Sequence, residues 1–384
     1  MSNTSKKYTY FVTGGGTGGH IYPAMAVCEA LKNDAETKDI FYIGNPKNLE
    51  YGIVKKAGFK FLPIKVSAMP RRLSFGLIKW AFELELANWK ALYYLLKYKP
   101  DCILGTGGYV SAPTLFAATM IKKPFMIHDC DVHPGIVSKS VAPMAKAVSL
   151  AFEESEQFIN AHRFYVNGNP IRKAFKDLSK VDARLNLGLK NKLTICIMGG
   201  SQGAKSINNA TVKILRELSE KYNVQVIFQT GKKHYDTCVE KIKEVYPEFE
   251  NDKNLLVRPY FDDMATVLKA SDIAVSRAGS LSLSEICACG IAPILIPYPY
   301  AAADHQRKNA KTMLKNEACI YLEDSDTTPE SLMKFLSFLI ENPDKLELLQ
   351  NNTRSLAKYD STERIAKQLK SIARWQKRKR MKKQ

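Results

Sequence analysis

Short, continuous apolar runs alternate with segments of helical length along the whole chain. In the first half these runs occupy residues 8–12, 40–43, 61–64, 102–104, 125–128 and 147–150. Continuous apolar runs are typical of parallel strands that are buried on both faces, and glycine or proline follows most of them. The pattern therefore predicts a parallel sheet whose strands are joined by helices.

The same alternation restarts in the second half, after a polar stretch at residues 174–190 that we expect to be helical. There the apolar runs occupy residues 194–198, 224–228, 255–258, 273–276 and 292–296. A chain of 384 residues is too long for one compact core and fits two domains of ordinary size. We therefore predict an α/β protein with two doubly wound, Rossmann-like parallel-sheet domains.

A glycine-rich turn joins a buried strand to a helix in each half of the chain. The two turns read Gly14-Gly-Gly-Thr-Gly-Gly-His20 and Gly199-Gly-Ser-Gln-Gly-Ala204. Glycine allows a ligand to approach the backbone closely, and the following helix N-terminus offers unpaired N–H groups and a partial positive charge. Both turns therefore predict binding of a diphosphate or a sugar nucleotide.

Two familiar nucleotide sites do not fit these turns. Gly14-x-Gly16-x-x-Gly19 matches the dinucleotide fingerprint, but the second predicted strand ends in Gly44-Asn45 instead of the acid that would hold a ribose. Neither turn carries the Gly-Lys-Ser or Gly-Lys-Thr ending of a P-loop, since the second continues as Gly203-Ala-Lys-Ser206, which excludes a P-loop nucleotidase. The missing acid after the second predicted strand disfavours a nicotinamide cofactor.

The segment at residues 69–99 breaks the alternation, because it is aromatic and apolar on too many sides for an ordinary surface helix. Its start combines basic and large apolar side chains, namely Arg71, Arg72, Leu73, Phe75, Ile78 and Trp80. This combination is typical of a membrane-surface patch, so we predict membrane contact there. From Leu84 onward, simple covering of the sheet explains the pattern equally well.

Composition and charge narrow the class of protein. With 45% hydrophobic and 25% charged residues the chain belongs to the folded soluble class. The net charge of +19 is concentrated partly in residues 374–383, which we expect to form a mobile arm that seeks a polyanion such as lipid headgroups or nucleic acid. A solvated tail that only aids solubility is the alternative.

Cysteine usage and the N-terminus indicate the compartment. No apolar stretch is long enough to span a bilayer, and the N-terminus leads into a short strand instead of the longer apolar region of a signal peptide, so we expect a cytoplasmic protein. The 8 cysteines are scattered without CxxC pairs. They are expected to be reduced core residues.

Eight motifs follow one another along nearly the whole chain. They are the first glycine turn with His20, Gly107-Gly-Tyr-Val-Ser-Ala-Pro113, His128 with an acid and Pro134-Gly135, Gly168-Asn-Pro-Ile-Arg172, Gly199-Gly-Ser-Gln-Gly-Ala204, Asp262-Asp-Met264, Ser276-Arg-Ala-Gly-Ser-Leu-Ser-Leu-Ser-Glu285, and Asp304-His-Gln306 with Asn309-Ala310. Together they resemble the MurG family of peptidoglycan N-acetylglucosaminyltransferases. The resemblance implies the GT-B fold, with two domains facing a central cleft.

The resemblance also implies a division of labour between the domains. Residues 1–168 would form an acceptor and membrane-binding domain, and residues 169–345 a domain that binds UDP-N-acetylglucosamine (UDP-GlcNAc). Residues 346–384 would supply a C-terminal helix that returns to the N-terminal domain, followed by the basic tail. The implied location is cytoplasmic and peripheral, on the inner face of the cell membrane.

The reaction implied by the resemblance is an inverting transfer of GlcNAc. The MurNAc 4-hydroxyl of the lipid-linked acceptor, lipid I, would attack the anomeric carbon, UDP would leave, and lipid II would form without a metal or other cofactor. The implied partners are UDP-GlcNAc, lipid I and the anionic inner leaflet of the cytoplasmic membrane. Other cell-wall synthesis proteins are further candidate partners, and no nucleic acid is expected.

Site residues carry over position by position. Donor contacts are implied for Thr17, Gly18, Gly19, Asp131, Arg172, Ser201, Gln202, Phe261, Ser280, Leu281, Ser282, Leu283, Ser284, Glu285 and Gln306. Acceptor contacts are implied for Gly15, Tyr109, Ser111, His128 and Asp129. Glu285 would accept both ribose hydroxyls, Arg172 and Phe261 would lie near the uracil, and Gln306 would lie near the GlcNAc hydroxyls.

Two residues compete for the role of general base. His20 could take the proton from the attacking hydroxyl, since histidine is the residue type most often used as a general base; alternatively it only orders its turn and hydrogen-bonds substrate. The chain reads His128-Asp-Cys-Asp131 where the family usually has His-Glu-Gln-Asn, so Asp131 replaces an amide. Asp131 either acts as or assists the base or, as we favour, accepts a hydrogen bond from a sugar hydroxyl, and the shorter Asp129 has less reach than the usual acid.

Other functions remain open at this point. Asp129-x-Asp131 is also a pattern that binds Mn²⁺ or Mg²⁺ in another glycosyltransferase class, although it lies away from the diphosphate loops. Another GT-B enzyme with a lipid acceptor, or a UDP-GlcNAc 2-epimerase, would share the donor loops. A nucleic-acid-binding protein would share the basic tail, but no nucleic-acid module is recognisable.

Overall fold

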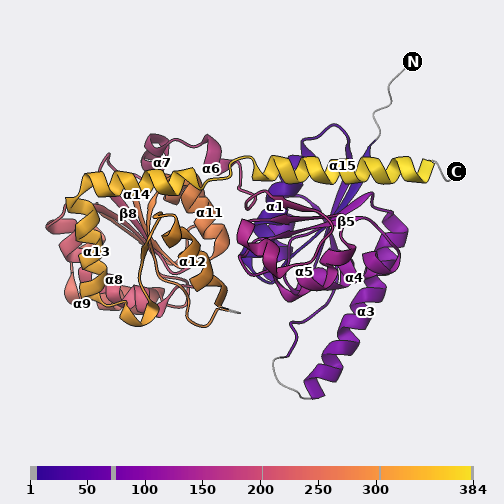
Figure 1. The fold of residues 1–384 in the computed structure, drawn as a ribbon. Helices are drawn as coiled ribbons and strands as arrows, with labels where there is room; N and C mark the ends of the chain where they lie inside the picture. The colour runs from indigo at the N-terminus through magenta and orange to yellow at the C-terminus, as the bar shows by residue number, and fades with distance from the viewer. Residues whose placement is uncertain (1–6, 71–74, 201, 302–303, 382–384) are drawn as a thin grey trace. The chain divides into compact units, whose positions relative to one another are not determined.

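The computed structural model describes residues 7–70, 75–200, 202–301 and 304–381 (Figure 1). The chain divides into two compact units. Unit 1 comprises residues 1–172 and 358–384, and unit 2 comprises residues 173–357. The polypeptide therefore leaves unit 1, forms unit 2 and ends with a helix that belongs to unit 1.

Unit 1 is built on a seven-stranded sheet in the order β3-β2-β1-β4-β5-β6-β7, in which all neighbours are parallel. Its strands are β1 (Tyr8–Thr13), β2 (Thr37–Gly44), β3 (Lys60–Pro63), β4 (Cys102–Gly105), β5 (Phe125–Asp129), β6 (Ala147–Leu150) and β7 (Phe164–Val166). Its helices are α1 (Gly18–Lys32), α2 (Leu49–Lys56), α3 (Phe75–Tyr98), α4 (Ala112–Met120), α5 (Ile136–Val141) and α15 (Ser361–Met381).

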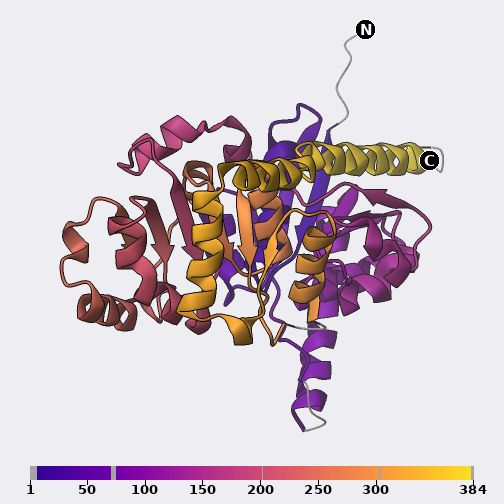
Figure 2. The same cartoon turned by 60° about the vertical axis from the view of Figure 1, so that its left-hand side comes forward.

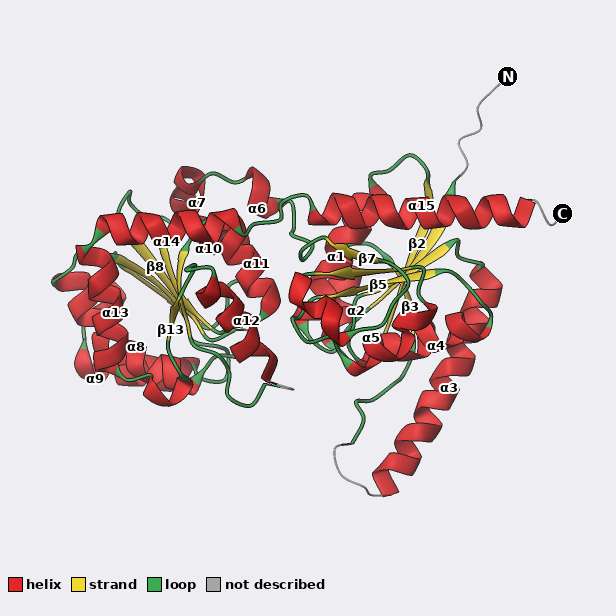
Figure 3. Ribbon diagram, in the orientation of Figure 1, coloured by secondary structure: helices red, strands yellow, loops and turns green. Residues whose placement is uncertain are grey.

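Helices cover both faces of this sheet. Successive residues of β1 face opposite sides, as the pleat requires. Phe11 belongs to a core with α3, α4 and α5, whereas Tyr10 and Val12 belong to a core with α1, α2 and α15 (Figure 3). This two-sided burial explains why the strand sequences read as continuous apolar runs.

Unit 2 repeats the plan with a six-stranded parallel sheet in the order β10-β9-β8-β11-β12-β13. Its strands are β8 (Thr194–Met198), β9 (Gln225–Gln229), β10 (Leu255–Arg258), β11 (Ile273–Ser276), β12 (Ala292–Leu295) and β13 (Ile320–Tyr321). Its helices are α6 (Ala174–Asp177), α7 (Lys180–Asn186), α8 (Lys205–Glu220), α9 (Tyr235–Val245), α10 (Met264–Ala270), α11 (Ser280–Cys289), α12 (His305–Lys315), α13 (Pro329–Glu341) and α14 (Pro343–Ser355).

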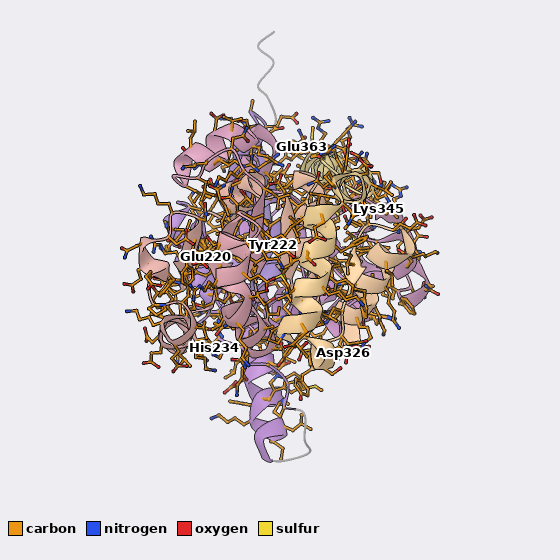
Figure 4. All side chains as sticks on the ribbon, turned by 90° about the vertical axis from the view of Figure 1, so that its left-hand side faces the viewer. Glu220, Tyr222, His234, Asp326, Lys345 and Glu363 are labelled. Carbon is orange, nitrogen blue, oxygen red and sulfur yellow. The ribbon has the colours of Figure 1, made fainter. Side chains whose placement is uncertain are left out.

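Figure 4 looks onto the side of unit 2 where α8 and α13 lie, with Glu220 and Tyr222 labelled at the end of α8. The Tyr222 hydroxyl donates to the Glu341 carboxylate at the end of α13, with 3.2 Å between the oxygens. The two helices bury Leu215, Leu218 and Leu332 in one core. These contacts stabilise one helical layer of unit 2.

The predicted α/β fold class is confirmed. Three features differ from the prediction: residues 174–190, the two edge strands, and the basic tail. Residues 174–190 form two short helices instead of one, because Ser179 accepts a hydrogen bond from the Asp182 N–H (3.1 Å) and caps a new helix, α7. The edge strands β7 and β13 were not predicted; they are only 3 and 2 residues long and are half-buried.

The basic tail is helical as far as Met381 within the described residues, so the expected mobile arm is wrong there. The helix is held because Ile365, Leu369 and Ala373 are buried in a core of unit 1. Arg374, the first residue of the basic run, forms an ion pair with Glu36. Docking of an apolar face thus overrides the repulsion among like charges.

The unusual segment after β3 forms a single helix, α3. Ala87, Ala91 and Leu95 are buried against the sheet, so this part of the segment does cover it. Figures 1 and 2 both show the N-terminal part of α3 extending away from the rest of unit 1. Among the described residues no helix is long and apolar enough to cross a membrane.

Candidate active site

Both glycine turns lie at the point where their sheet reverses its strand order. In unit 1 the turns after β1 and β4 are neighbours, because these two strands pair directly. In unit 2 the turns after β8 and β11 are neighbours for the same reason. Ligands of open α/β sheets bind outside the carboxyl ends of the strands at this point. The topology therefore places a candidate site in each unit.

The first glycine turn is supported by a buried carboxylate that sequence analysis missed. Glu50, in the first turn of α2, is 0% exposed, and its Oε2 and Oε1 accept hydrogen bonds from the N–H groups of Gly16 (3.2 Å) and Asn45 (3.1 Å). A Cβ on Gly15 would lie 2.6 Å from the Glu50 carboxyl carbon. Position 15 thus requires glycine, because a Cβ there would collide with the Glu50 carboxylate.

Tyr109 forms one wall of this turn. Gly16 has a φ of +85°, and a Cβ there would lie 3.0 Å from the Tyr109 ring. The Tyr109 hydroxyl accepts a hydrogen bond from the Asn48 amide (2.9 Å). Ser111, also predicted to contact the acceptor, is fully buried and donates to the Gly108 carbonyl (2.8 Å), so its hydroxyl shapes the turn after β4.

His20 occupies the first turn of α1, between the two loops. Its Nδ1 lies 3.0 Å from the Thr17 hydroxyl oxygen. Its ring packs against Gly107 and Gly108, where a Cβ would come within 2.8 Å of Cδ2 and 3.1 Å of Nδ1. If Nδ1 carries the proton and donates to Thr17, Nε2 presents a lone pair that can accept a proton from a substrate. This geometry fits a base and equally fits a residue that orders its turn.

His128 is an internal residue of unit 1. It is 0% exposed, with Nδ1 lying 3.0 Å from the Ser149 hydroxyl oxygen and Nε2 3.1 Å from the Asn169 amide oxygen. Burial lowers the pKa of His128 to about 4, so the ring is neutral at pH 7. The ring therefore links β5, β6 and the segment after β7. Because it is fully buried, His128 can influence the position of an acceptor only through these elements.

Asp129 closes the loop that follows β5. Its carboxylate accepts hydrogen bonds from the N–H groups of Asp131 (3.3 Å) and Gly135 (3.1 Å), the residue that precedes α5. Burial raises the pKa of Asp129. Asp131 is half-buried, and its carbonyl accepts a hydrogen bond from Ser155 (3.0 Å). Asp129 thus fixes the loop that carries Asp131.

In unit 2 the glycine turn after β8 is closely packed against the turn after β9. Gly203 has a φ of +78°, and a Cβ there would lie 2.0 Å from the Thr230 carbonyl oxygen. Gln229, which sequence analysis missed, donates to the Gly200 carbonyl (3.3 Å) and accepts from the Phe261 N–H (2.9 Å). It joins the glycine turn to the predicted base-binding residue. Gln202 is exposed, and Ser201 lies outside the described residues.

The N-terminus of α11 presents backbone donors. The Leu283 N–H makes the first helical bond, to the Gly279 carbonyl (3.0 Å), which leaves the N–H groups of Ser280, Leu281 and Ser282 before it without a helical acceptor. The Leu283 side chain is buried in a core, and the Ser284 hydroxyl donates to the Ser280 carbonyl (3.0 Å). The backbone N–H groups that this helix can offer to an anion are therefore its first three.

Glu285 lies one turn into α11 and is 8% exposed. Two residues of α12 hold the segment that precedes this helix. The Gln306 amide oxygen accepts from the N–H groups of Ala278 (3.2 Å) and Tyr298 (3.0 Å), and Asn309 donates to the Ala278 carbonyl (3.2 Å). The predicted sugar contact Gln306 thus also positions the N-terminus of α11.

Arg277 ties the two helix N-termini of unit 2 together, a role that sequence analysis did not assign. Its guanidinium donates to Asp324 (2.6 Å) and to the hydroxyl of Ser206 in the first turn of α8 (3.2 Å). It also donates to the carbonyls of Ile296 and Pro297, both at 3.1 Å. Its side chain is 12% exposed. Arg277 therefore connects the loops after β11 and β12 with α8.

The remaining predicted residues have simpler surroundings. Gly18 and Gly19 begin α1. Arg172 is the last residue of the first segment of unit 1, with its guanidinium carbon 5.0 Å from the Tyr22 ring centroid. Among the described residues no group of three or more His, Cys, Asp or Glu side chains is arranged to hold a metal.

The chain matches two family descriptions in order. Residues 10–150 match the glycosyltransferase family 28 N-terminal domain, and residues 194–369 match the family 28 C-terminal domain. Together these matches cover most of the chain.

Curated relatives are similar over nearly their whole length. The chain is 36% identical to a protein of Thermoanaerobacter sp. (strain X514), over 94% of this chain and 99% of the relative. It is 35% identical to a protein of Carboxydothermus hydrogenoformans, over 92% and 94% of the two chains. Both relatives are named UDP-N-acetylglucosamine--N-acetylmuramyl-(pentapeptide) pyrophosphoryl-undecaprenol N-acetylglucosamine transferase.

Solved structures share the fold. Acinetobacter baumannii MurG aligns with a TM-score of 0.73 at 24% identity, over 95% of this chain and 99% of that one. A UDP-GlcNAc 2-epimerase from Neisseria meningitidis aligns with a TM-score of 0.68 at 13% identity, over 94% and 99%. Fold alone therefore does not separate the two activities. The family matches and the curated relatives do: the chain belongs to glycosyltransferase family 28 and, within it, to the MurG family of N-acetylglucosamine transferases.

Proposed function

We propose that the protein transfers GlcNAc from UDP-GlcNAc to the MurNAc 4-hydroxyl of lipid I, undecaprenyl-pyrophosphoryl-MurNAc-pentapeptide, and so forms lipid II. The observation that carries this proposal is 36% identity over 94% of the chain to a transferase of that name. The placement of the predicted residues at the strand-order reversal of both sheets supports it.

Unit 2 would hold the donor. When the glycosidic bond to UDP breaks, negative charge develops on the diphosphate, and fixed N–H donors at a helix N-terminus stabilise that charge. The first three amides of α11 and those at the start of α8, directly after the glycine turn, would provide such donors. Glu285 would accept hydrogen bonds from the ribose hydroxyls, which a carboxylate does better than a neutral group.

Unit 1 would hold the acceptor. The Nε2 of His20 would take the proton from the attacking hydroxyl, in the tautomer whose Nδ1–H donates to Thr17. Asp131 would accept a hydrogen bond from a sugar hydroxyl. Asp129 and His128 would act as positioning residues, because their polar atoms bind the loop that carries Asp131 and the strands behind it.

Membrane contact would involve the outer face of α3. Six large apolar side chains on this helix are more than half exposed, namely Ile78, Phe82, Leu86, Trp89, Tyr93 and Leu96. Such a continuous apolar stripe on a soluble protein marks an interaction surface. Lys79 and Lys90, both exposed, would meet anionic headgroups of the inner leaflet. Of the predicted patch, Arg71, Arg72 and Leu73 lie outside the described residues, as does the side chain of Phe75, and the Trp80 indole donates to the Ser67 carbonyl (3.0 Å).

The test is a transfer assay with UDP-[¹⁴C]GlcNAc and a lipid I analogue. The expected result is labelled lipid II analogue together with one UDP released for each sugar transferred. Incubation with UDP-GlcNAc alone is the control: formation of UDP-ManNAc without acceptor would overturn the proposal in favour of an epimerase. Transfer to diacylglycerol and not to the lipid I analogue would overturn it in favour of another lipid glycosyltransferase.

A further inference from the structure

A cavity of about 380 Å³ lies in unit 1 between α15 and the strands β6 and β7. Lys146 and Arg163 reach it from the residues that precede β6 and β7, and Arg364 and Lys367 reach it from α15. These strand starts are at the edge of the sheet opposite to the turns after β1 and β4. The cavity is therefore separate from the acceptor site.

The lining of this cavity is strongly cationic. It includes four basic side chains and no carboxylate. Arg364 forms an ion pair with Asp360 at 2.6 Å, whereas Lys146, Arg163 and Lys367 make no ion pair with the described carboxylates. Like charges that lie close together without a counter-charge repel one another, so an anion bound from solution would stabilise this cluster.

The two flanks of α15 differ in how their charges are balanced. On one flank Lys370 and Arg374 pair with Asp34 and Glu36. On the cavity side Lys146 and Lys379 instead lie over the Trp375 ring, at 4.7 and 5.2 Å from its centroid. Apart from Asp360 beside Arg364, the ion pairs formed by the described part of α15 are thus on the flank away from the cavity. A basic tail that served solubility alone gives no reason for this asymmetry.

The walls of the cavity are firmly held. Gln368 exchanges two hydrogen bonds with Asn167, at 2.8 and 3.1 Å, and so ties α15 to the end of β7. Ile365, Leu369 and Ala373 anchor the inner face of the same helix in the core. The cations are thus presented from elements whose backbone is fixed, which lowers the entropic cost of binding.

We infer that this cavity binds an anion that carries two or more phosphate groups. Arginine and lysine are the side chains that bind phosphate oxygens, arginine through its planar fork and lysine as a point charge. Tyr165 and Ser371 add hydroxyl groups to the lining. The ligand is either a free polyphosphate or the headgroups of anionic lipids, which share this chemistry.

The test compares two triple variants of equal charge. The cavity variant is K146Q/R163Q/K367Q, and the matched control is K38Q/K55Q/K56Q, which removes three exposed cations elsewhere on unit 1. Both should keep normal GlcNAc transfer, since none of these residues belongs to the proposed active site. If the wild-type protein transfers no GlcNAc, that result contradicts the proposed function and leaves the inference about this cavity unaffected.

Calorimetry with inorganic pyrophosphate, in the presence of saturating UDP to fill the donor site, gives the first readout. We expect one bound pyrophosphate per chain in wild type and in the control variant, and binding weakened at least about tenfold in the cavity variant because three contacts are lost. The second readout is sedimentation with phosphatidylcholine vesicles that contain or lack phosphatidylglycerol.

The two readouts separate the sources of phosphate. Loss of pyrophosphate binding with unchanged vesicle association supports a free polyphosphate. Reduced association with phosphatidylglycerol vesicles in the cavity variant, beyond that of the control variant, supports lipid headgroups. Equal behaviour of the two triple variants in both assays would overturn the inference, because it would leave only the overall positive charge as the cause.

Discussion

The two glycine turns have similar sequences and different electrostatic surroundings. In unit 1 the Gly16 N–H is occupied by Glu50, a buried carboxylate from the protein itself. In unit 2 the first turns of α8 and α11 contain no acidic residue, and Arg277 lies between them, paired with Asp324. A diphosphate is therefore favoured at the second turn, whereas the first is better suited to neutral sugar hydroxyls. The spacing of the glycines predicts that a ligand can approach the backbone closely, and the surrounding charges determine which kind of ligand binds.

The largest expected effect concerns the proton acceptor in unit 1. His20→Ala should lower kcat by about 10²–10⁴, because a positioned general base contributes that range. The affinity for UDP should stay the same, since UDP would bind unit 2. Stopped assays with the lipid I analogue give kcat, and calorimetry gives the UDP affinity. Near-normal turnover would leave His20 as a residue that only orders its turn.

Next in size is the backbone of the donor turn. Gly203→Ala should destabilise the protein by on the order of 3 kcal/mol, because the residue has a positive φ and its Cβ would overlap a carbonyl oxygen. UDP binding should be lost with it. Gly52→Ala in α2 is the matched control: no atom lies within 4 Å of its Cβ, and alanine there should stabilise by about 0.5–1 kcal/mol. Urea unfolding distinguishes them, and equal midpoints would contradict the packing described.

The acid sensitivity of unit 1 should come partly from His128. Its pKa is about 4 in the folded protein and near 6.5 when unfolded, so the unfolded state binds more protons between these values. Its contribution to stability is therefore complete above pH 6.5 and decreases as the pH falls toward 4, by up to about 3 kcal/mol. His128→Gln should flatten this part of the curve of unfolding free energy against pH. An unchanged slope would show that the ring titrates normally.

The smallest effect is expected at Asp131. Asp131→Asn should change kcat by less than about threefold, because an amide oxygen accepts the same hydrogen bond from a sugar hydroxyl. The assay is the one used for His20→Ala, with that variant as the reference for loss of the base. A decrease as large as that of His20→Ala would move the role of base to Asp131.

Much of the fold could be predicted from the sequence, because parallel strands buried on both faces leave continuous apolar runs. The glycine turns and His20 were found for a similar reason, since their chemistry is local. Glu50, Gln229 and Arg277 were missed because their partners are distant in sequence; Glu50, for example, binds the N–H of a residue 34 positions away. Nothing in the sequence around an acid in a short helix indicates that it is buried.

The basic tail was predicted wrongly for a related reason. Its charge dominates the sequence, whereas the contacts that hold α15 as a helix come from Ile365, Leu369 and Ala373, which precede the basic run. For α3, covering of the sheet was one of two interpretations from Leu84 onward, and Ala87 and Ala91 do cover it. The exposure of Phe82 and Trp89 on the opposite face was not predicted. Helix docking depends on partners that the local sequence does not contain.

The most direct test of the account is calorimetric binding of UDP to two carboxamide variants, one in each unit. Glu285→Gln should weaken UDP binding by about 10–100-fold, because a charged hydrogen-bond acceptor for the ribose is lost. Glu50→Gln should leave UDP affinity within about twofold of wild type, because its carboxylate supports the other turn. Weakened binding in Glu50→Gln together with unchanged binding in Glu285→Gln would contradict the assignment of the donor to unit 2.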